Sequence, residues 1–307
     1  MAEKDVREKL LEDYEDVFAD IVNVLAFGGQ RLLDPVRLRE GPTVSRYKDG
    51  EADLREQIRD VIKFDQNEAM LAVFGLENQT REEPHMVFRV MGYDYGSYKY
   101  QMDREQKILS PVITLVLHFG LTRWKEPKDI WSAVRKDVPY RDYLKKNLPN
   151  FRIKVIDVAF LPKKVRELFT SDFRIVADYF SAVRKKRPEE IRYDQRTIRH
   201  VAEILDFFAT FGKDKRFQVC KPKLVEQAKK GEEIKMCIVM DYAEKQGIKQ
   251  GMDLGIKQGL SQGIKEGRFL QLCDLVQSGL LTLEQAAGAC QMTEKEFQKQ
   301  MESGNML

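Results

Sequence analysis

The sequence predicts an α/β protein in which helices flank a mixed β-sheet and a helical extension follows. Three observations lead to this prediction. Four apolar or alternating runs have the length of strands, segments with helical periodicity surround them, and a glycine repeat of period four occupies the C-terminal part. The expected order is helix, strand, strand, helix, strand, strand, and then helices.

Composition limits the classes of function. The 307 residues suffice for one large domain or two modest ones, and 43% hydrophobic with 33% charged residues is typical of a soluble globular protein. The net charge of +3 excludes a histone-like polycation, so any nucleic-acid surface has to be a local patch. No signal-peptide core and no run of about 18 uncharged apolar residues is present, so we expect a cytoplasmic protein without a membrane span.

The cysteines and histidines are too scattered for a zinc site. No CxxC motif occurs, and a disulfide framework is not expected either. We expect free thiols in a reducing compartment at Cys220, Cys237, Cys273 and Cys290.

The first expected helix spans residues 5–27 and ends at Gly28-Gly29. An acidic strip containing Asp20 runs beside its apolar face. This strip is either a solvated flank, or Asp20 reaches a metal site. Residues 30–56 are expected to form an irregular or short-helical connector.

The remaining elements of the first part follow from periodicity and from turn residues. The run at 112–119 is nearly all apolar, which is typical of a central strand covered on both faces. The expected strands are 57–64, 70–79, 112–119 and 151–158, and the expected helices are 85–106 and several within 162–212.

A glycine occupies every fourth position from Gly247 to Gly267, and an apolar residue follows most of these glycines. Each glycine costs a helix about 1 kcal/mol relative to alanine, so an isolated helix here is marginal. Glycine at this spacing also lets two helix backbones approach closely. Residues 245–268 are therefore either a self-association helix that forms a homo-oligomer or a flexible tether. A helical hairpin is expected at 269–303.

The candidate catalytic residues are Asp60, Glu77 and Gln79. Both acids lie in otherwise apolar strand-like runs, where an unpaired carboxylate is expensive to bury. Two such carboxylates on neighbouring strands suit a shared Mg²⁺, or Mn²⁺ in its place, with the backbone carbonyl of Asn78 as a further ligand. This arrangement would support hydrolysis of a phosphodiester.

The register of the predicted hairpin decides this hypothesis. Asp60 lies opposite Glu77 only if paired residue numbers sum to about 137, whereas a tight turn at Gln66-Asn67 would place Asp60 opposite Val73. The alternative interpretation is a polar hairpin whose acids pair with Arg59, Lys63 or Arg89.

Several segments resemble the PD-(D/E)xK nuclease superfamily, and more closely its recombination-promoting nuclease/putative transposase family. The resemblance covers roughly residues 5–300. The segments that carry it are Arg59-Asp60-Val61, Glu77-Asn78-Gln79-Thr80, Met86 to Tyr93, Pro111 to Gly120 with Trp124, and the glycine repeat.

This resemblance implies a restriction-endonuclease-like αβββαβ core and Mg²⁺-dependent cleavage of DNA, with Asp60 and Glu77 binding metal and Gln79 at the third catalytic position. A lysine is usual at that position. Gln79 is neutral, so this site lacks the lysine charge, and Arg89 could supply a supplementary cation. The expected domains are a nuclease-like domain at 1–220, a glycine-repeat segment at 221–268 and a helical hairpin at 269–307.

DNA contacts are expected from two basic groups. Arg89 and Tyr93 share a helical face beside Gln79, with Lys99 further along, although the tyrosines could equally cap the core. The second group is the run Arg184, Lys185, Lys186 and Arg187. The function expected from these features is a metal-dependent DNA endonuclease. The alternative is a non-catalytic DNA-binding or assembly protein on the same fold.

Overall fold

The computed structural model describes residues 10–41, 44–49, 53–58, 60–66, 69–187 and 189–303, with backbone alone for 44–49 and 53–58. The chain divides into two compact units, Met1–Ala243 and Glu244–Leu307. Each unit is described by itself below.

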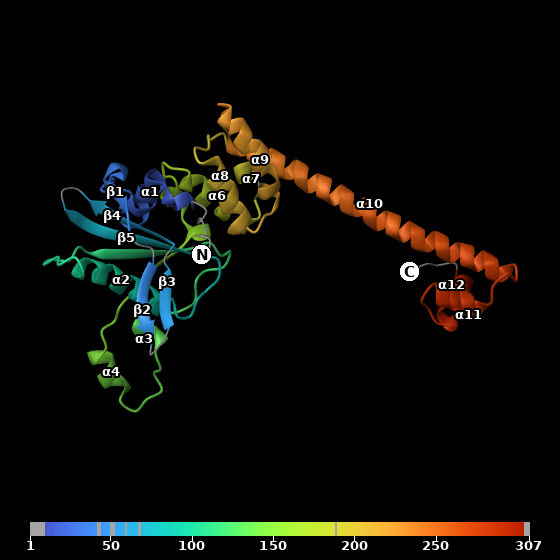
Figure 1. Cartoon of the computed structure of the whole chain (residues 1–307), viewed down its shortest axis with the longest axis horizontal. Helices are drawn as coiled ribbons and strands as arrows, with labels where there is room; N and C mark the ends of the chain where they lie inside the picture. Colours follow the sequence, from blue (N-terminus) through green and yellow to red (C-terminus); the bar gives the residue numbers. More distant parts are fainter. Residues whose placement is uncertain are drawn as a thin grey trace. The chain divides into compact units, whose positions relative to one another are not determined.

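The first unit is built on a five-stranded mixed sheet with the order β1-β4-β5-β6-β7 (Figure 1). Strands β1, β4 and β5 are antiparallel neighbours, whereas β5, β6 and β7 run parallel to one another. The carboxyl ends of the three parallel strands therefore meet at one edge of the sheet. The strands are β1 (Leu38–Glu40), β4 (Val61–Gln66), β5 (Met70–Gln79), β6 (Val112–His118) and β7 (Lys154–Asp157).

Helices cover both faces of this sheet, as predicted. On one face, the short 3₁₀ helix η1 (Leu11–Asp13) and helix α1 (Glu15–Leu25) pack against Leu76, Leu115 and Leu117. On the other face, α2 (Met86–Met102) packs against Val116. Residues 115–117 alternate between the two faces, which is the strand periodicity of two.

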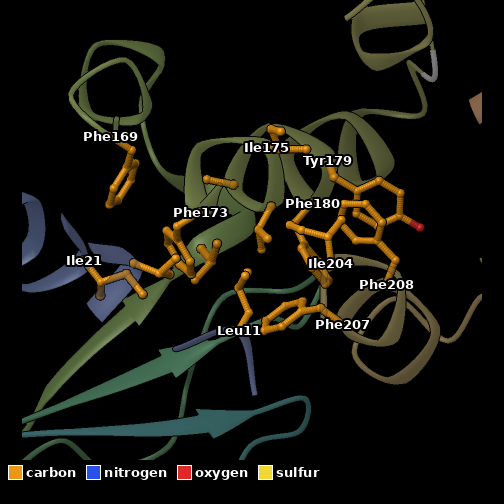
Figure 2. Packing of buried hydrophobic residues seen from close by; sticks show 14 of the residues in the cluster. Leu11, Ile21, Phe169, Phe173, Ile175, Tyr179, Phe180, Ile204, Phe207 and Phe208 are labelled. Carbon is orange, nitrogen blue, oxygen red and sulfur yellow. The ribbon is translucent and has the colours of Figure 1, made fainter. Parts of the chain in front are cut away.

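A layer of aromatic side chains joins the later helices to the end of β6. Phe119 contacts Phe180 of α6 and Phe207 of α8, with ring centroids 5.1 and 5.0 Å apart. Phe180 and Phe207, both labelled in Figure 2, meet edge to face within this core, with ring centroids 6.3 Å apart. The elements of this region are η3 (Val158–Phe160), α5 (Lys163–Arg166), α6 (Phe173–Lys185), α7 (Glu189–Arg192), α8 (Val201–Thr210) and α9 (Arg216–Lys229).

Two sequence predictions need correction. The expected helix at 5–27 begins outside the described residues, and the described part is broken at Tyr14, whose ψ of 130° is extended. The connector at 30–56 is not irregular throughout, because it contains η2 (Pro35–Arg37), β1 and the hairpin of β2 (Val44–Asp49) with β3 (Asp53–Ile58). Charged residues fill so many positions of these strands that no apolar alternation marks them.

The other predicted elements of the first unit are present within a few residues of their expected bounds. Gly28 and Gly29 follow α1 with φ angles of 65° and 95°, the left-handed conformation that favours glycine. Two short helices, α3 (Ile130–Ala133) and α4 (Arg141–Asn147), lie between β6 and β7.

The glycine repeat is helical and belongs to α10 (Met236–Gln277), a helix of 42 residues. In the second unit, the end of α10 packs through Phe269 and Cys273 against α11 (Leu283–Ala289) and α12 (Glu294–Ser303), with Phe297 fully buried. The first part of the hairpin expected at 269–303 is the end of α10 rather than a helix of its own. Thr282 and Gln285 form a capping box at the start of α11.

The apolar side chains of the repeat are largely exposed in the described part of the chain. Ile248, Met252, Ile256, Leu260 and Ile264 are 58–65% exposed. A Cβ added at any glycine from Gly251 to Gly267 would meet no atom within 4 Å.

All four cysteines are free thiols. In the described part of the chain, no helix combines the length and apolar character needed to cross a bilayer.

The exposed repeat leads to a prediction about oligomeric state. If a second copy covers α10, deletion of residues 245–307 should lower the mass measured by light scattering to that of a monomer. The double variant Gly255→Leu and Gly259→Leu should also lower the mass while retaining helicity by circular dichroism, because leucine favours the helix but blocks close approach. The control is Lys257→Leu. A truncated chain with the same number of copies as the full chain would show that α10 does not mediate association.

Candidate active site

The register of β4 against β5 brings the two candidate acids together. Val61 pairs with Leu76 and Phe64 with Val73, so the paired numbers sum to 137. Continuing this register by one residue places Asp60 beside Glu77. The alternative with Asp60 opposite Val73 is wrong, because an irregularity at Asp65/Gln66 takes up the difference at the turn.

Glu77 is buried and hydrogen-bonded on the α2 face of the sheet. Its Oε1 accepts hydrogen bonds from Gln79 Nε2 at 2.9 Å and from Arg89 Nη2 at 2.6 Å, and the Tyr93 hydroxyl lies 3.5 Å away. Gln79 and Glu77 thus share a face, as strand alternation predicted. The ion pair with Arg89 was part of the alternative interpretation, and it forms here.

Of the other two expected cations, Lys63 is buried and donates to Glu15 at 3.1 Å instead of pairing with Glu77. The expected pairing with Arg59 falls on a residue outside the described part of the chain.

Asn78 connects Asp60 to a third acid, Glu12. The backbone N–H of Asn78 donates to Asp60 Oδ2 at 2.7 Å, and its side-chain Nδ2 donates to Glu12 Oε1 at 3.1 Å. Glu12 belongs to η1 and is fully buried. Sequence periodicity missed Glu12 because it assumed one continuous helix, and the break at Tyr14 shifts the face on which residues 11–13 lie.

Burial and mutual repulsion change the proton affinity of these acids. Burial, followed by the charge of Asp60, raises the pKa of Glu77 to about 7, although Arg89, Gln79 and Tyr93 oppose this shift. Burial is also the main cause that raises the pKa of Glu12 to about 8, and Asp60 adds to it. Asp60 is therefore electrostatically close to both glutamates.

Three buried oxygens at this site have no hydrogen-bond donor: Glu12 Oε2, Glu77 Oε2 and Asn78 Oδ1. An unsatisfied buried acceptor costs about 1–3 kcal/mol, so such a group of acceptors is unusual in a purely structural region. On the α2 face, Glu77 and its register partner Asp60 offer only oxygen ligands, which is what Mg²⁺ or Mn²⁺ prefers, whereas the Glu12 and Asn78 side chains lie on the other face.

No group of three or more His, Cys, Asp or Glu side chains in the described part of the chain is placed to hold a metal ion together. A cation at this site would therefore be held by two carboxylates and amide oxygens. This is compatible with Mg²⁺, which usually takes one or two protein carboxylates and keeps water or substrate phosphate in its other positions.

The structure does not bring Asp20 to this site. The Asp20 carboxylate accepts hydrogen bonds from Arg31, from the backbone N–H groups of Thr170 and Ser171, and from the Ser171 hydroxyl. It ties α1 to the start of α6. The expectation that Asp20 reaches the candidate site is therefore corrected, and the acid of the N-terminal segment that is linked to Asp60, through Asn78, is Glu12.

The expected DNA-contact residues differ in their exposure. Tyr93 is buried beneath the surface, where its hydroxyl accepts from Arg89 at 2.9 Å, whereas Lys99 is exposed near the end of α2.

The four residues of the basic run at the end of α6, Arg184 to Arg187, also differ in their contacts. Lys185 and Arg187 form ion pairs with Glu190, and Lys186 ends the helix with a φ of 58°. Arg184 instead donates to the carbonyl of Ala159 at 2.8 Å.

Because the pKa of Glu12 is raised, we predict that ionisation of this side chain destabilises the folded state. The folded state keeps the proton that the unfolded chain releases near pH 4.5, so the free energy of unfolding should fall as pH rises from about 4.5 to about 8. Glu12→Gln retains the acceptor for Asn78 and cannot ionise. Urea unfolding in EDTA should show this variant more stable than wild type at pH 7.5, by on the order of 1–3 kcal/mol, with the difference vanishing at pH 4.5.

The control is Glu226→Gln, which changes an exposed glutamate. Parallel pH profiles for Glu12→Gln and wild type would show that Glu12 does not titrate as described.

Comparisons with known proteins give a family. A family model described as "Putative transposase, YhgA-like" matches residues 44–205, which is more than half of the chain and includes Asp60, Glu77 and Gln79. No match was found among curated proteins or among solved structures. The chain belongs to the family of YhgA-like putative transposases.

Proposed function

We propose that this protein is a divalent-cation-dependent DNA endonuclease that hydrolyses phosphodiester bonds. The observation that carries the proposal is that the register of β4 against β5 places Asp60 beside the buried Glu77, whose Oε2 lacks a donor. Membership of a family named for transposases fits an activity on DNA.

Asp60 and Glu77 would hold the cation, with Mg²⁺ or Mn²⁺ fitting the oxygen donors and Asn78 supplying a further oxygen. When bound, such an ion polarises a phosphate oxygen and makes a bound water more acidic. Asn78 fixes the Asp60 carboxylate through its backbone N–H, and Gln79 and Arg89 fix Glu77. Glu12, on the opposite face of the strand end, accepts a hydrogen bond from the Asn78 side chain and so helps to fix this residue.

A lysine usually occupies the third catalytic position in PD-(D/E)xK nucleases. Here Gln79 would take that position and Arg89 would supply the positive charge. Gln79 cannot act as a base or carry a charge, and its amide is used to orient Glu77. Arg89 supplies the positive charge, and about a third of its side chain is exposed to solvent. A guanidinium presents several donors in a plane, so Arg89 could contact Glu77 and a phosphate oxygen together.

The topology supports a restriction-endonuclease-like core within the PD-(D/E)xK superfamily. Apart from the separate β2–β3 hairpin, the order α1, β1, β4, β5, α2, β6 follows the expected αβββαβ arrangement, in which β4 and β5 carry the acids and α2 is the crossover before the parallel strand β6. Cleavage by such an enzyme would promote recombination or transposition-like events.

A second candidate is a DNA-binding or assembly protein without catalysis. The ion pair between Glu77 and Arg89 favours it, because a carboxylate already neutralised by a guanidinium attracts a cation less strongly. Tight, salt-sensitive DNA binding with no cleavage in Mg²⁺ or Mn²⁺ would identify this alternative.

Nicking of supercoiled plasmid tests the proposal. Asp60→Asn keeps an oxygen acceptor for the Asn78 N–H but removes the charge, so we expect nicking in Mg²⁺ to fall by more than about 100-fold. Asp103→Asn, at the exposed end of α2, is the matched control and should nick as wild type does. Equal nicking by Asp60→Asn and wild type would remove Asp60 from the reaction.

A further inference from the structure

Two guanidinium groups stack on a single phenyl ring near the candidate site. The Cζ atoms of Arg123 and Arg184 lie 4.6 and 4.5 Å from the ring centroid of Phe160. Since both lie so near one ring, the two positive charges cannot be far apart. Each cation is attracted to the ring, but the two charges repel each other.

Neither guanidinium forms an ion pair with a carboxylate of the described residues. Arg184 donates its Nε–H to the carbonyl of Ala159, which leaves its two Nη groups for other acceptors. Arg123 is exposed, and Arg184 is half-buried. The nearby Lys185 and Arg187, by contrast, both form ion pairs with Glu190.

Contacts with the ends of β6 and β7 fix the loop that carries Arg123. Asp157 at the end of β7 accepts hydrogen bonds from the backbone N–H of Trp124 and contacts His118 Nδ1 at 2.8 Å. This contact anchors the loop that carries Arg123. Gly120 lets this loop pass close to His118, since a Cβ there would lie 2.3 Å from the histidine Nε2.

The stack lies at the same sheet edge as the candidate active site. Phe160 is in η3, directly after β7, and β7 and β6 run parallel to β5, which ends at Gln79. Thr80 and Val183, the neighbours of Gln79 and Arg184 in sequence, line one small cavity of about 140 Å³. The two arginines therefore lie at the same edge of the sheet as the end of β5, with β6 between β5 and β7.

We propose that Arg123 and Arg184, held on Phe160, form a clamp for a backbone phosphate that flanks the cleaved bond. The clamp rests on the proposed DNA-directed function and assigns it a substrate contact. A phosphate bridging both guanidiniums would relieve their mutual repulsion and accept several hydrogen bonds. Such a contact positions the nucleic acid without reading its sequence.

The salt dependence of DNA binding tests this clamp. Binding of the full-length protein to a duplex is measured in EDTA, so that no cleavage occurs, at several salt concentrations. One clamped phosphate should contribute about 0.9 to the slope of log K against log salt, so the double variant Arg123→Gln and Arg184→Gln should lower the magnitude of this slope by about 0.9. The single-charge control Lys229→Gln, on α9, should leave the slope unchanged.

A second double variant tests whether the glutamine variant has simply lost its folded structure. Arg123→Lys with Arg184→Lys keeps both charges, so it should recover the wild-type slope but bind more weakly, because lysine lacks the planar fork. Phe160→Leu should weaken binding by releasing both guanidiniums. An unchanged slope in the double glutamine variant would overturn the clamp, as would tight, Arg123-dependent binding of a mononucleotide in place of the duplex.

The outcomes separate the clamp from the proposed reaction. A wild-type protein that nicks plasmid through Asp60, but whose salt slope does not depend on the two arginines, would refute the clamp alone. A protein that shows the expected slopes but never nicks would refute the endonuclease and retain the clamp. A wild-type protein with no affinity for DNA would contradict both.

Discussion

The register of β4 against β5 is the constraint on which the candidate site depends. With Val61 opposite Leu76, Asp60 is placed beside Glu77, and the N–H of Asn78 can donate to the Asp60 carboxylate. A shift by one residue would send every side chain of β4 to the other face of the sheet. The apolar side chains of β4, Val61, Ile62 and Phe64, are all buried in the observed register, so the packing on both faces of the sheet accompanies the position of the acids.

The same strand end connects the two faces of the sheet. Glu77 and Gln79 point toward α2, where Arg89 lies, whereas Asn78 points toward η1 and Glu12. Asp60 acts electrostatically on both glutamates. This geometry concentrates acidic groups in a region that excludes water, and the raised pKa values of Glu12 and Glu77 show that the fold is destabilised by keeping them there. Such a cost is expected at functional sites, where the arrangement serves ligand binding rather than stability.

The strands with a clear apolar pattern, and the acids within them, could be predicted from the sequence. The runs around Asp60 and Glu77 and the run at 112–119 identified three sheet strands and the pairing that matters. The hairpin of β2 and β3 could not be recognised, because charged residues hide its periodicity. Glu12 was missed for a related reason, since a local break at Tyr14 changes which residues of the first segment face the sheet.

Tertiary contacts that no local pattern encodes explain the remaining differences. Asp20 looked like a metal ligand on an acidic strip, but Thr170 and Ser171, about 150 positions away in sequence, supply its hydrogen-bond donors. The basic run at 184–187 looked uniform, yet Glu190 neutralises part of it and Phe160 holds Arg184.

The most direct test of the account is the anomalous scattering of Mn²⁺ in crystals of the wild-type protein. The account predicts one ion within about 2 Å of carboxylate oxygens of both Asp60 and Glu77, and no such peak in crystals of Asp60→Asn. A fully ordered site without an ion at saturating Mn²⁺, with Glu77 still paired to Arg89, would contradict it.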